Sequence, residues 1–482
     1  MILSNLLKNV KVLTVKGDEE CEVRKLCFDS RQVEADDCFV ATRGTSVDGH
    51  QFIPQVIDKG AKVIVCEEIP ADYLNNVTFV LVDDSREALG IMAANSYGNP
   101  SEKLTLVGVT GTNGKTSIAT LLWQLFRKMG HKVGLLSTVV NRIDDKAVPS
   151  THTTPDPIEL NALLSEMVKA ECKYAFMEVS SHSADQRRIA GIKFAGGIFT
   201  NLTRDHLDYH KTIENYLKAK KRFFDDLPDG TFAITNADDR NGSVMLQNTR
   251  ARKITYSIRK VADFYGRIDD ESIEGMQMNF EGMDVFMPFV GRFNASNILA
   301  VYATAVQLGV ERHEALRLIS SLKAVDGRFE TIRGRNGVTA IVDYAHTPDA
   351  LENVIRTINE IKKGKLITVC GCGGNRDKGK RPMMAKEAQH NSDLVVLTSD
   401  NPRDEDPDAI LADMTTGLTA EEMRKVTVMA DRREAIKLAC SILAQSGDIV
   451  LIAGKGHEDY QIIKGVKYHF DDREEATKAL GL

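Results

Sequence analysis

A glycine-rich turn between an apolar run and an amphipathic stretch constrains the fold of this chain most. The apolar run predicts a buried strand from Leu104, Leu106, Val107 and Val109, and the turn is Gly111 to Thr116 (Gly-Thr-Asn-Gly-Lys-Thr). A helix should follow and end at Gly130, because apolar residues recur at helical spacing: Ile118, Leu121, Leu122, Leu125 and Phe126. A strand, a glycine turn and a helix in this order present backbone N–H groups and a positive helix end to an anion. The feature therefore predicts a phosphate-binding loop.

The residues of this loop suit a nucleoside triphosphate. Gly111 and Gly114 let the backbone approach phosphate oxygens, Lys115 would reach the β- and γ-phosphates, and the Thr116 hydroxyl would bind Mg²⁺. Val109 stands where the usual motif has its first glycine. A plain strand-to-helix turn with an exposed lysine is the alternative, but the flanking strand and helix patterns favour the nucleotide loop.

Length and composition indicate an ordinary globular protein of several domains. With 482 residues, 43% of them hydrophobic and 27% charged, the chain has room for roughly three domains of about 150 residues. A formal charge of −6 argues against nucleic-acid binding through bulk electrostatics. No leader-like start and no apolar run of about 18 residues is present, so we expect a cytoplasmic protein without a membrane span. The eight scattered cysteines are expected to be reduced.

The pattern predicts an α/β fold in three parts: residues 1–98, 99–328 and 329–482. Short apolar runs alternate with polar turns in the first part, and Asn99-Pro100-Ser101 interrupts both neighbouring patterns as a linker would. The turn clusters at 29–31 and 44–50 could bind a ligand, although such clusters are more often only turns.

A second magnesium ligand is expected after the strand Tyr174 to Met177. Glu178 follows this strand, and nucleotide hydrolases place a carboxylate at such a position. A further strand leads into the run from Asn201 to His210, where His206 and His210 are interleaved with aspartates. Zinc is an alternative here, but oxygen ligands predominate and favour Mg²⁺.

Lys220 interrupts the apolar stripe of the next helix. Ile213, Tyr216, Leu217, Phe223 and Phe224 form the stripe, whereas Lys218, Lys221 and Arg222 lie off it and are expected in solvent. A buried ammonium must be neutralised or paired, and burial lowers its pKa and makes the amine nucleophilic. A salt bridge to a core carboxylate and a CO₂-derived carbamate that binds Mg²⁺ are the two resolutions, and periodicity alone favours the salt bridge.

Four strands of the third part end in polar, glycine-bearing loops. These loops begin at Asp343, Gly371, Asp400 and Gly454. In an open parallel sheet such strand ends converge on one crevice, which is the expected ligand site. Arg376 and Arg403 near Glu458 would suit a zwitterionic ligand, because guanidinium groups bind carboxylates and a carboxylate binds an ammonium. Surface salt bridges are the alternative.

Ordered motifs along nearly the whole chain resemble those of the Mur ligase family. They are Thr110 to Thr116, Thr153 to Asp156, Glu178 to His182, Thr200 to Leu202, Asp205 to His210, Tyr216 with Ala219 and Lys220, Asp343 to Asp349, and Gly454 to Glu458. The resemblance implies a small α/β domain for a uridine nucleotide (1–98), a central P-loop ATPase with a mostly parallel sheet (99–328), and a Rossmann-like domain for an amino acid (329–482).

The resemblance also implies roles for individual residues. ATP would contact Gly111, Thr112, Asn113, Gly114, Lys115, Thr116, Asn297, Arg328, Asp343 and His346. The uridine nucleotide substrate would contact Ser30, Thr45, Ser46, Thr153, Thr154, Ser180, Gln186 and Arg188. The catalytic residues would be Lys115, Glu178, His206 and Lys220. Lys220 matches the family's carbamylated lysine, which reverses the preference for a salt bridge, and its carbamate would hold Mg²⁺ with Thr116, Glu178 and His206. Lys211 departs from the family pattern, which has glycine there.

The loop at Asp400 matches the family form associated with meso-2,6-diaminopimelate rather than lysine. The amino-acid ligands implied are Arg376, Asp400, Asn401, Pro402, Arg403, Gly454 and Glu458. Diaminopimelate has a second carboxylate for the two guanidinium groups, whereas lysine has none. Buried donors left unpaired would penalise lysine by about 10⁴-fold.

The function implied is ATP-dependent ligation of meso-2,6-diaminopimelate to UDP-N-acetylmuramoyl-L-alanyl-D-glutamate through an acyl phosphate. Rival hypotheses are an L-lysine-adding ligase, a folylpolyglutamate-type ligase, and a P-loop regulator that binds nucleotide without catalysis. We expect a monomer whose partners are these small molecules, with no nucleic acid.

Overall fold

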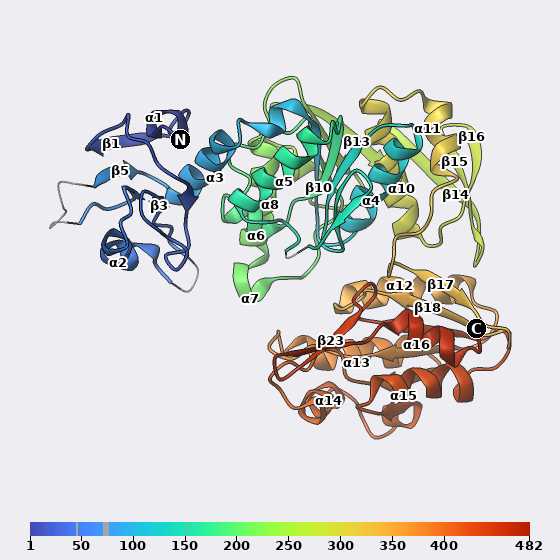
Figure 1. Ribbon diagram of the computed structural model, residues 1–482. Helices are drawn as coiled ribbons and strands as arrows, with labels where there is room; N and C mark the ends of the chain where they lie inside the picture. The colour runs from blue at the N-terminus through green and yellow to red at the C-terminus, as the bar shows by residue number, and fades with distance from the viewer. Residues whose placement is uncertain (45–46, 71–76, 151) are drawn as a thin grey trace.

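The computed structural model describes residues 1–44, 47–70, 77–150 and 152–482. In these residues the strands form sheets of five, eleven and six strands and one two-stranded hairpin, with helices covering the sheet faces (Figure 1). This is the α/β fold class that the sequence predicts. The proposed ligands Thr45 and Ser46 lie outside the described residues.

The five-stranded sheet lies at the N-terminal end and has the order β1-β5-β4-β3-β2. Strands β2 to β5 run parallel, and β1 pairs with β5 in the antiparallel direction. The elements are β1 (Val12–Lys16), β2 (Leu26–Cys27), β3 (Cys38–Val40), β4 (Val63–Cys66) and β5 (Thr78–Val82), with α1 (Leu3–Leu6), η1 (Gly49–Phe52), α2 (Ile53–Asp58) and α3 (Ser85–Ser96). The Asp84 side chain accepts the N–H groups of Arg86 and Glu87 and so caps α3, which leads toward the central sheet.

The eleven-stranded sheet is built around β6 (Thr105–Thr110), which lies between β10 (Tyr174–Glu178) and β11 (Gly196–Phe199). Its parallel part continues through β7 (Val133–Leu136), β12 (Phe232–Asn236), β13 (Arg252–Ser257) and β14 (Phe264–Ser272). Antiparallel strands extend both edges: β8 (Asn141–Ile143), β9 (Lys146–Val148), β15 (Gly275–Phe280) and β16 (Met283–Met287). The sheet is thus mostly parallel, as expected, with antiparallel edges that the sequence analysis did not foresee.

Helices cover the central sheet. They are η2 (Pro100–Lys103), α4 (Lys115–Lys128), α5 (Pro157–Lys169), α6 (Ser181–Asp185), α7 (Leu207–His210), α8 (Ile213–Asp225), α9 (Gly242–Met245), α10 (Arg292–Gln307) and α11 (Arg312–Ile319). The apolar stripe predicted for α4 is buried in full, from Ile118 to Phe126, in a core shared with β6, β10 and α10. This packing fixes the N-terminus of α4 at the carboxyl end of β6, where the predicted loop lies.

The six-stranded sheet has the order β17-β18-β22-β19-β20-β21, and only its edge strand β17 is antiparallel. Its strands are β17 (Glu330–Arg333), β18 (Thr339–Asp343), β19 (Leu366–Cys370), β20 (Leu394–Leu397), β21 (Val426–Val428) and β22 (Ile449–Ala453), and the separate hairpin is β23 (Tyr460–Ile463) and β24 (Val466–His469). Its helices are α12 (Pro348–Ile361), α13 (Lys380–Asn391), α14 (Pro407–Thr415), η3 (Glu422–Lys425), α15 (Arg432–Lys437), η4 (Leu438–Leu443) and α16 (Asp472–Ala479).

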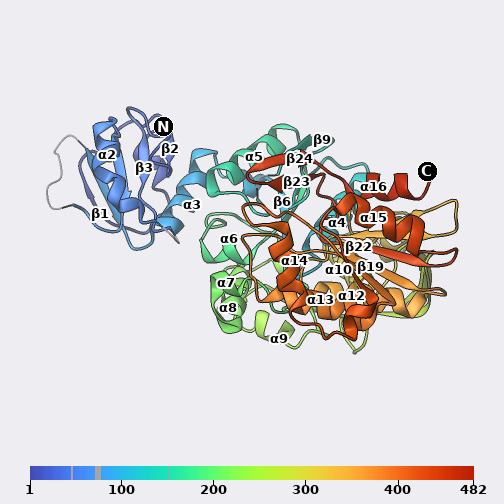
Figure 2. The same ribbon diagram turned by 90° about the horizontal axis from the view of Figure 1, so that it is seen from below.

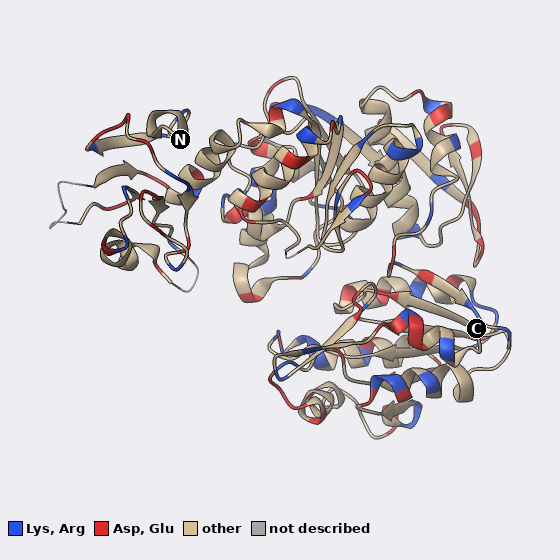
Figure 3. Cartoon of the chain, viewed as in Figure 1, with Lys and Arg blue, Asp and Glu red and all other residues tan. Residues whose placement is uncertain are grey.

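The three sheets belong to separate bodies, with the N-terminal one beside the central one and the C-terminal one below it in Figure 1. The perpendicular view shows the N-terminal body at one end, joined through α3 (Figure 2). Basic and acidic residues are interspersed over all three bodies (Figure 3). All eight cysteines are buried and free. Within the described residues, no helix is both long and apolar enough to cross a bilayer.

Candidate active site

The loop between β6 and α4 requires glycine at both predicted positions. Gly111 has φ +150°, and a Cβ there would lie 1.8 Å from the Thr200 hydroxyl oxygen. Gly114 has φ +90°, and a Cβ there would lie 2.5 Å from Asn297 Oδ1. Residues with a side chain rarely adopt these backbone angles, and at Gly111 the Thr200 contact also leaves no room for a Cβ. Gly114 is also the N-cap of α4, so the loop places its backbone N–H groups at a helix N-terminus.

Lys115 and Thr116 point back into the loop and toward the sheet. Lys115 Nζ donates to the carbonyl oxygens of Gly111 (2.9 Å) and Thr112 (2.8 Å). Burial lowers the pKa of Lys115, although the carboxylates of Glu178 and Asp205 oppose this shift. The Thr116 hydroxyl donates to Glu178 Oε1 (2.8 Å), so helix α4 and strand β10 bring the two predicted metal ligands into contact.

Glu178 is 1% exposed at the carboxyl end of β10. Its Oε1 also accepts the backbone N–H of Thr138 (2.7 Å). The predicted substrate residue Thr154 donates to the Glu178 carbonyl oxygen (2.8 Å) and accepts the N–H of Ser180 (3.1 Å). Arg188 donates to the Thr154 carbonyl oxygen (3.0 Å) and to Gln186 Oε1 (2.7 Å). These predicted substrate residues therefore form one hydrogen-bonded group behind Glu178.

Lys220 is inside the protein, 1% exposed, as the periodicity of α8 predicts. Its Nζ donates to the carbonyl oxygen of Gly111 (2.8 Å) and lies 4.6 Å from the centre of the Tyr216 ring. Burial and the nearby charge of Lys115 put the pKa of Lys220 well below its usual value. Within the described chain no carboxylate lies within 4.0 Å of this nitrogen, so the salt bridge that periodicity favours is not formed. Lys220 is a weakly basic buried amine beside the phosphate loop.

The sequence analysis was wrong about Lys221. We expected this side chain in solvent, but it is 9% exposed, and its Nζ donates to Asp225 Oδ1 (2.5 Å) one turn further along α8. An i, i+4 pair to an acid on the same helix allows a lysine to leave the solvent at small cost.

His206 lies in the loop after β11, its Nε2 3.4 Å from Asp205 Oδ2. Burial lowers the pKa of His206 to about 4, against the opposing charge of Asp205. A neutral imidazole keeps a lone pair for a metal ion. Among the described residues, no three His, Cys, Asp or Glu side chains are arranged to hold a metal. Glu178, the Thr116 hydroxyl, the His206 imidazole and the Lys220 amine nevertheless line one cavity, and a carbamate on that amine would add the oxygen ligands that Mg²⁺ prefers.

A cavity of about 500 Å³ brings most of the predicted ATP and metal ligands together. It lies between the central and C-terminal bodies, and its lining includes Thr112, Asn113, Gly114, Lys115, Thr116, Thr153, Glu178, Ser180, His206, Lys220, Asn297, Arg328, Asp343 and His346. Asp205 and Asp349 line it too. Sequence analysis missed these two as site residues, although both stand within its quoted motifs.

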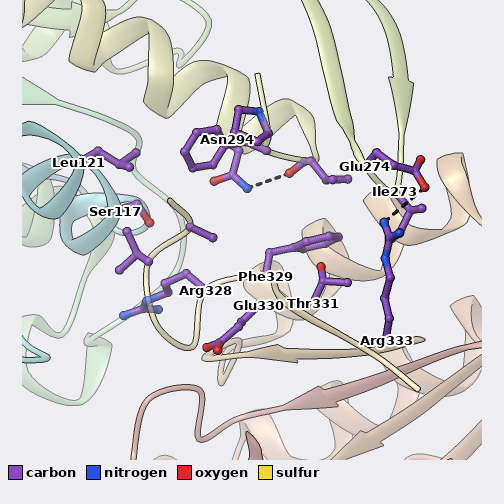
Figure 4. A pocket seen from close by; sticks show the side chains of 15 residues that line it. Ser117, Leu121, Ile273, Glu274, Asn294, Arg328, Phe329, Glu330, Thr331 and Arg333 are labelled. Atoms are coloured by element: carbon purple, nitrogen blue, oxygen red, sulfur yellow. Dashed lines mark hydrogen bonds and ion pairs between the residues drawn. The ribbon is translucent and has the colours of Figure 1, made fainter. Parts of the chain in front are cut away.

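A second cavity, of about 520 Å³, adjoins the first and shares Ser117 and Arg328 with it (Figure 4). Leu121, Phe329 and Asn294 line it, and the ion pair of Glu274 and Arg333 (3.3 Å) lies at one side. Arg328 Nη2 donates to the Thr116 hydroxyl (3.3 Å), and its guanidinium lies over the Tyr344 ring. The loop between α11 and β17 thus carries one side chain that faces both cavities.

Ser30 belongs to the N-terminal body and lines neither cavity. It is buried in the loop after β2, and Lys59 Nζ donates to its carbonyl oxygen (2.7 Å).

The loops after β20 and β22 converge as predicted. Asn401 Nδ2 donates to Glu458 Oε2 (2.8 Å), and Lys455, fully buried, lies 3.3 Å from Asp400 Oδ1 and 3.7 Å from Glu458 Oε2. Burial and the charge of Asp400 raise the pKa of Glu458. At Asp400 burial also acts to raise the pKa, but Lys455, Arg432 and Arg403 together outweigh it and lower the pKa. Sequence analysis missed Lys455, although it stands in the quoted motif from Gly454 to Glu458.

The loops that carry the two predicted arginines are joined. Arg403, at φ +54°, donates from Nη1 to the Gly374 carbonyl oxygen (2.8 Å). Pro402 packs against the same loop, since a Cβ on Gly374 would lie 1.9 Å from its carbonyl oxygen. Arg376 is exposed.

A buried arginine that no motif indicated lies beneath these loops. Arg381 of α13 is 1% exposed and donates to both carboxylate oxygens of Glu405 (2.9 and 3.0 Å) and to Asp413 (2.8 Å). Glu405 in turn accepts the backbone N–H of Asn375 (2.5 Å). Arg381 and Glu405 therefore tie together the loops that carry Arg376 and Arg403.

Comparisons with known proteins give matches along nearly the whole chain. Family profiles match in chain order: "Mur ligase family, catalytic domain" at residues 22–97, "Mur ligase middle domain" at 109–305, and "Mur ligase, glutamate ligase domain" at 327–456. The chain is 60% identical over 476 residues, 98% of each chain, to the UDP-N-acetylmuramoyl-L-alanyl-D-glutamate–2,6-diaminopimelate ligase of Parabacteroides distasonis. A solved structure of a ligase with that name is similar along 100% of this chain and 99% of its own (TM-score 0.71, 33% identity). The Thermotoga maritima MurF ligase in complex with ADP shares the fold (TM-score 0.61, 20% identity, covering 95% of this chain and 98% of its own).

Proposed function

This chain belongs to the Mur ligase family, and we propose how its residues carry out the reaction that names the Parabacteroides distasonis relative. It is an ATP-dependent ligase of peptidoglycan precursor synthesis that adds 2,6-diaminopimelate to UDP-N-acetylmuramoyl-L-alanyl-D-glutamate. The mechanism rests on one observation: buried Lys220 contacts the phosphate loop inside a cavity that the central and C-terminal bodies both line.

ATP binds with its triphosphate on the loop from Gly111 to Thr116. The α4 N-terminus and Lys115 stabilise the negative charge of the phosphoryl group during transfer. The second cavity suits the base, because apolar side chains line part of it and it shares Arg328 with the cavity at the phosphate loop. Asn297, Asp343 and His346 lie along the cavity wall as further nucleotide contacts.

The D-glutamyl carboxylate of the uridine nucleotide substrate attacks the γ-phosphorus, ADP leaves, and an acyl phosphate forms. The amine of diaminopimelate then attacks the acyl carbon, phosphate leaves, and the amine loses its proton. We place the uridine nucleotide between Ser30 in the N-terminal body (1–98) and Thr153, Thr154, Ser180, Gln186 and Arg188 in the central body (99–328). The acyl phosphate needs an enclosed site, because water would otherwise hydrolyse it.

Lys220 reacts as a neutral amine with CO₂ to give a carbamate and one proton. Its lowered pKa supports this reaction, because the ammonium form has no lone pair. The carbamate, Glu178, Thr116 and neutral His206 would hold Mg²⁺, which would supply positive charge to the phosphoryl oxygens.

The C-terminal body (329–482) binds the amino acid. Glu458 and Asp400 face its ammonium group, and the loops of Arg376 and Arg403 face the distal carboxylate that lysine lacks. Asn401, Pro402 and Gly454 shape the space between these charges. We further propose that the protein is a cytoplasmic monomer.

The test is amino-acid-dependent phosphate release with ATP and UDP-N-acetylmuramoyl-L-alanyl-D-glutamate, with mass spectrometry of the product. A product heavier by one diaminopimelate residue is expected. Equal turnover with lysine would refute the specificity, and nucleotide binding without any product would favour the non-catalytic regulator.

A further inference from the structure

One carboxylate of the C-terminal body reaches the phosphate loop directly. Asp349 lies in the first turn of α12, and its Oδ2 accepts hydrogen bonds from Asn113 Nδ2 (3.1 Å) and Thr203 Oγ1 (3.0 Å). Asn113 is within the loop that follows β6, and Thr203 is in the loop that follows β11. A single oxygen atom therefore touches both loops of the central body at which the phosphoryl chemistry is expected.

No other hydrogen bond in the described chain joins α12 to the central body. The same helix has one ion pair to it, Arg292 with Glu360 at 3.7 Å, but both of these side chains are about half exposed. Exposed ion pairs of this kind contribute little to stability. The Asp349 contacts are partly buried and line the cavity itself.

The charge of Asp349 argues that its task is not to bind phosphate. A carboxylate repels a phosphate group, and Asp349 has no ion-pair partner within 4.0 Å among the described residues to neutralise it. Its two donors are neutral side chains, one from each loop.

The six-stranded sheet connects α12 to the loop that is expected to bind the amino acid. Helix α12 follows β18, and β18 pairs in parallel with β22, with Asp343 opposite Ala453. The loop from Gly454 to Glu458 leaves β22 at the same edge. Fixing the N-terminus of α12 therefore also fixes where this loop stands relative to the phosphate loop.

We propose that Asp349 is a positioning residue that docks the C-terminal body on the phosphate loop, so that the bound amine faces the acyl phosphate. This inference rests on the proposed function. It assigns Asp349 to the second half-reaction and to domain docking, and gives it no direct contact with ATP.

The experiment compares full-length Asp349→Ala and Asp349→Asn with the wild type. Glu352→Ala is the matched control, because Glu352 is an exposed acid on the same helix whose ion pair is with Arg356 of that helix. We expect Asp349→Ala to lower kcat at least tenfold while the dissociation constant for ATP changes less than threefold. Asp349→Asn should fall in between, since its amide oxygen can still accept both hydrogen bonds but carries no charge to strengthen them. Glu352→Ala should match the wild type.

A double-mutant cycle with Thr203→Val separates docking from a general effect on folding. If Asp349 acts through Thr203, the double variant should have a kcat within about twofold of that of Asp349→Ala. Multiplicative losses would overturn the proposal, as would an unchanged kcat or a loss of ATP affinity equal to the loss of kcat.

Small-angle scattering tests docking without any activity assay. The radius of gyration of Asp349→Ala should exceed that of the wild type and of Glu352→Ala, with and without a non-hydrolysable ATP analogue. Identical scattering of all three proteins would overturn docking even if the ligase reaction is confirmed. If the wild type makes no product but Asp349→Ala still has the larger radius of gyration, the proposed function is refuted and the docking role of Asp349 is retained.

Discussion

The side-chain nitrogen of Lys220 lies 2.8 Å from the carbonyl oxygen of Gly111, so the buried amine and the first glycine of the phosphate loop are in direct contact. This contact joins two features that the sequence shows separately. It also places a weakly basic amine where a carbamate would face the triphosphate.

Lys220→Ala should lower kcat by at least 10³-fold, because the oxygen ligands that a carbamate would supply are lost. Acetate or another short carboxylate should restore part of the activity by supplying oxygen atoms in the space that the side chain leaves. Steady-state phosphate release with and without added carboxylate measures both effects.

Lys221→Ala is the matched control for that change. Lys221 is the next residue on α8, is also buried, and pairs with Asp225 rather than with the loop. It should retain activity within a few-fold. If Lys220→Ala keeps its activity, Lys220 has only a structural role and the carbamate proposal is contradicted.

Arg403→Ala should raise KM for diaminopimelate about 10- to 100-fold, the size of one charge-assisted hydrogen bond. The distal carboxylate of the substrate then has one guanidinium fewer to bind. Activity with lysine, which lacks that carboxylate, should stay the same. The ratio of activity with diaminopimelate to activity with lysine should therefore fall. Arg403→Lys should recover only part of the loss, because an ammonium cannot bind a carboxylate through two parallel hydrogen bonds. An equal loss with both amino acids would contradict the assignment.

Arg381→Met should raise KM for diaminopimelate about tenfold and leave KM for ATP unchanged. Arg381 holds Glu405, and Glu405 holds the loop of Asn375, so the predicted ligand Arg376 would lose its support. Hydrogen bonds from Arg381 also lower the pKa of Glu405 to about 2, so this carboxylate stays ionised at any assay pH. Glu405→Gln keeps the shape and should give a smaller rise in KM. If KM for ATP rises together with KM for diaminopimelate, the substitution disturbs folding rather than the amino-acid site, and the prediction is contradicted.

Local patterns predicted the parts of the site that depend on neighbours in the sequence. The strand, loop and helix from Leu104 to Lys128, and the inward position of Lys220, follow from periodicity and turn chemistry. That Lys220 has the Gly111 carbonyl as its partner, and no carboxylate among the described residues, could not be predicted, because Gly111 lies 109 residues earlier in the chain.

Contacts between distant segments explain the other omissions. Arg381 stands in a helix with no distinct apolar face, and its partners, Glu405 and Asp413, come from segments further along the chain. The antiparallel strands β15 and β16 have mixed burial, and periodicity alone does not show which sheet they extend. Lys221 leaves the solvent only because Asp225 follows it by one helical turn.

Acidification should weaken diaminopimelate binding earlier than an ordinary glutamate would. Burial and Asp400 raise the pKa of Glu458 above 4.5, so its ionised form is lost at a higher pH than that of an exposed carboxyl group. The amino acid's ammonium binds the ionised form, and KM should therefore rise as the pH falls through this raised pKa. In Glu458→Gln, KM should be high and independent of pH over the same range. A wild-type KM that stays constant down to pH 4.5 would contradict the role of Glu458.

Lys211→Gly should stabilise the central body by about 1 kcal/mol. Lys211 has φ +68° and ψ −43°, and the Thr212 N–H donates to the His210 carbonyl oxygen (2.8 Å), which makes a strained three-residue turn. A non-glycine residue in this conformation destabilises the folded protein by about 1 to 3 kcal/mol. Glycine removes that strain, but its greater freedom in the unfolded chain destabilises the fold by roughly 0.5 to 1 kcal/mol.

The measurement is urea unfolding, with and without ADP. ADP binds the central body, so the unfolding transition whose midpoint shifts with ADP is that of the central body, and this midpoint is compared among the variants. Lys211→Ala keeps the strain and loses the bond from Lys211 Nζ to the Asp208 carbonyl oxygen (2.6 Å), so it should be no more stable than the wild type. Equal stabilisation by alanine and glycine would show that the side chain, and not the backbone angle, is the source of the strain.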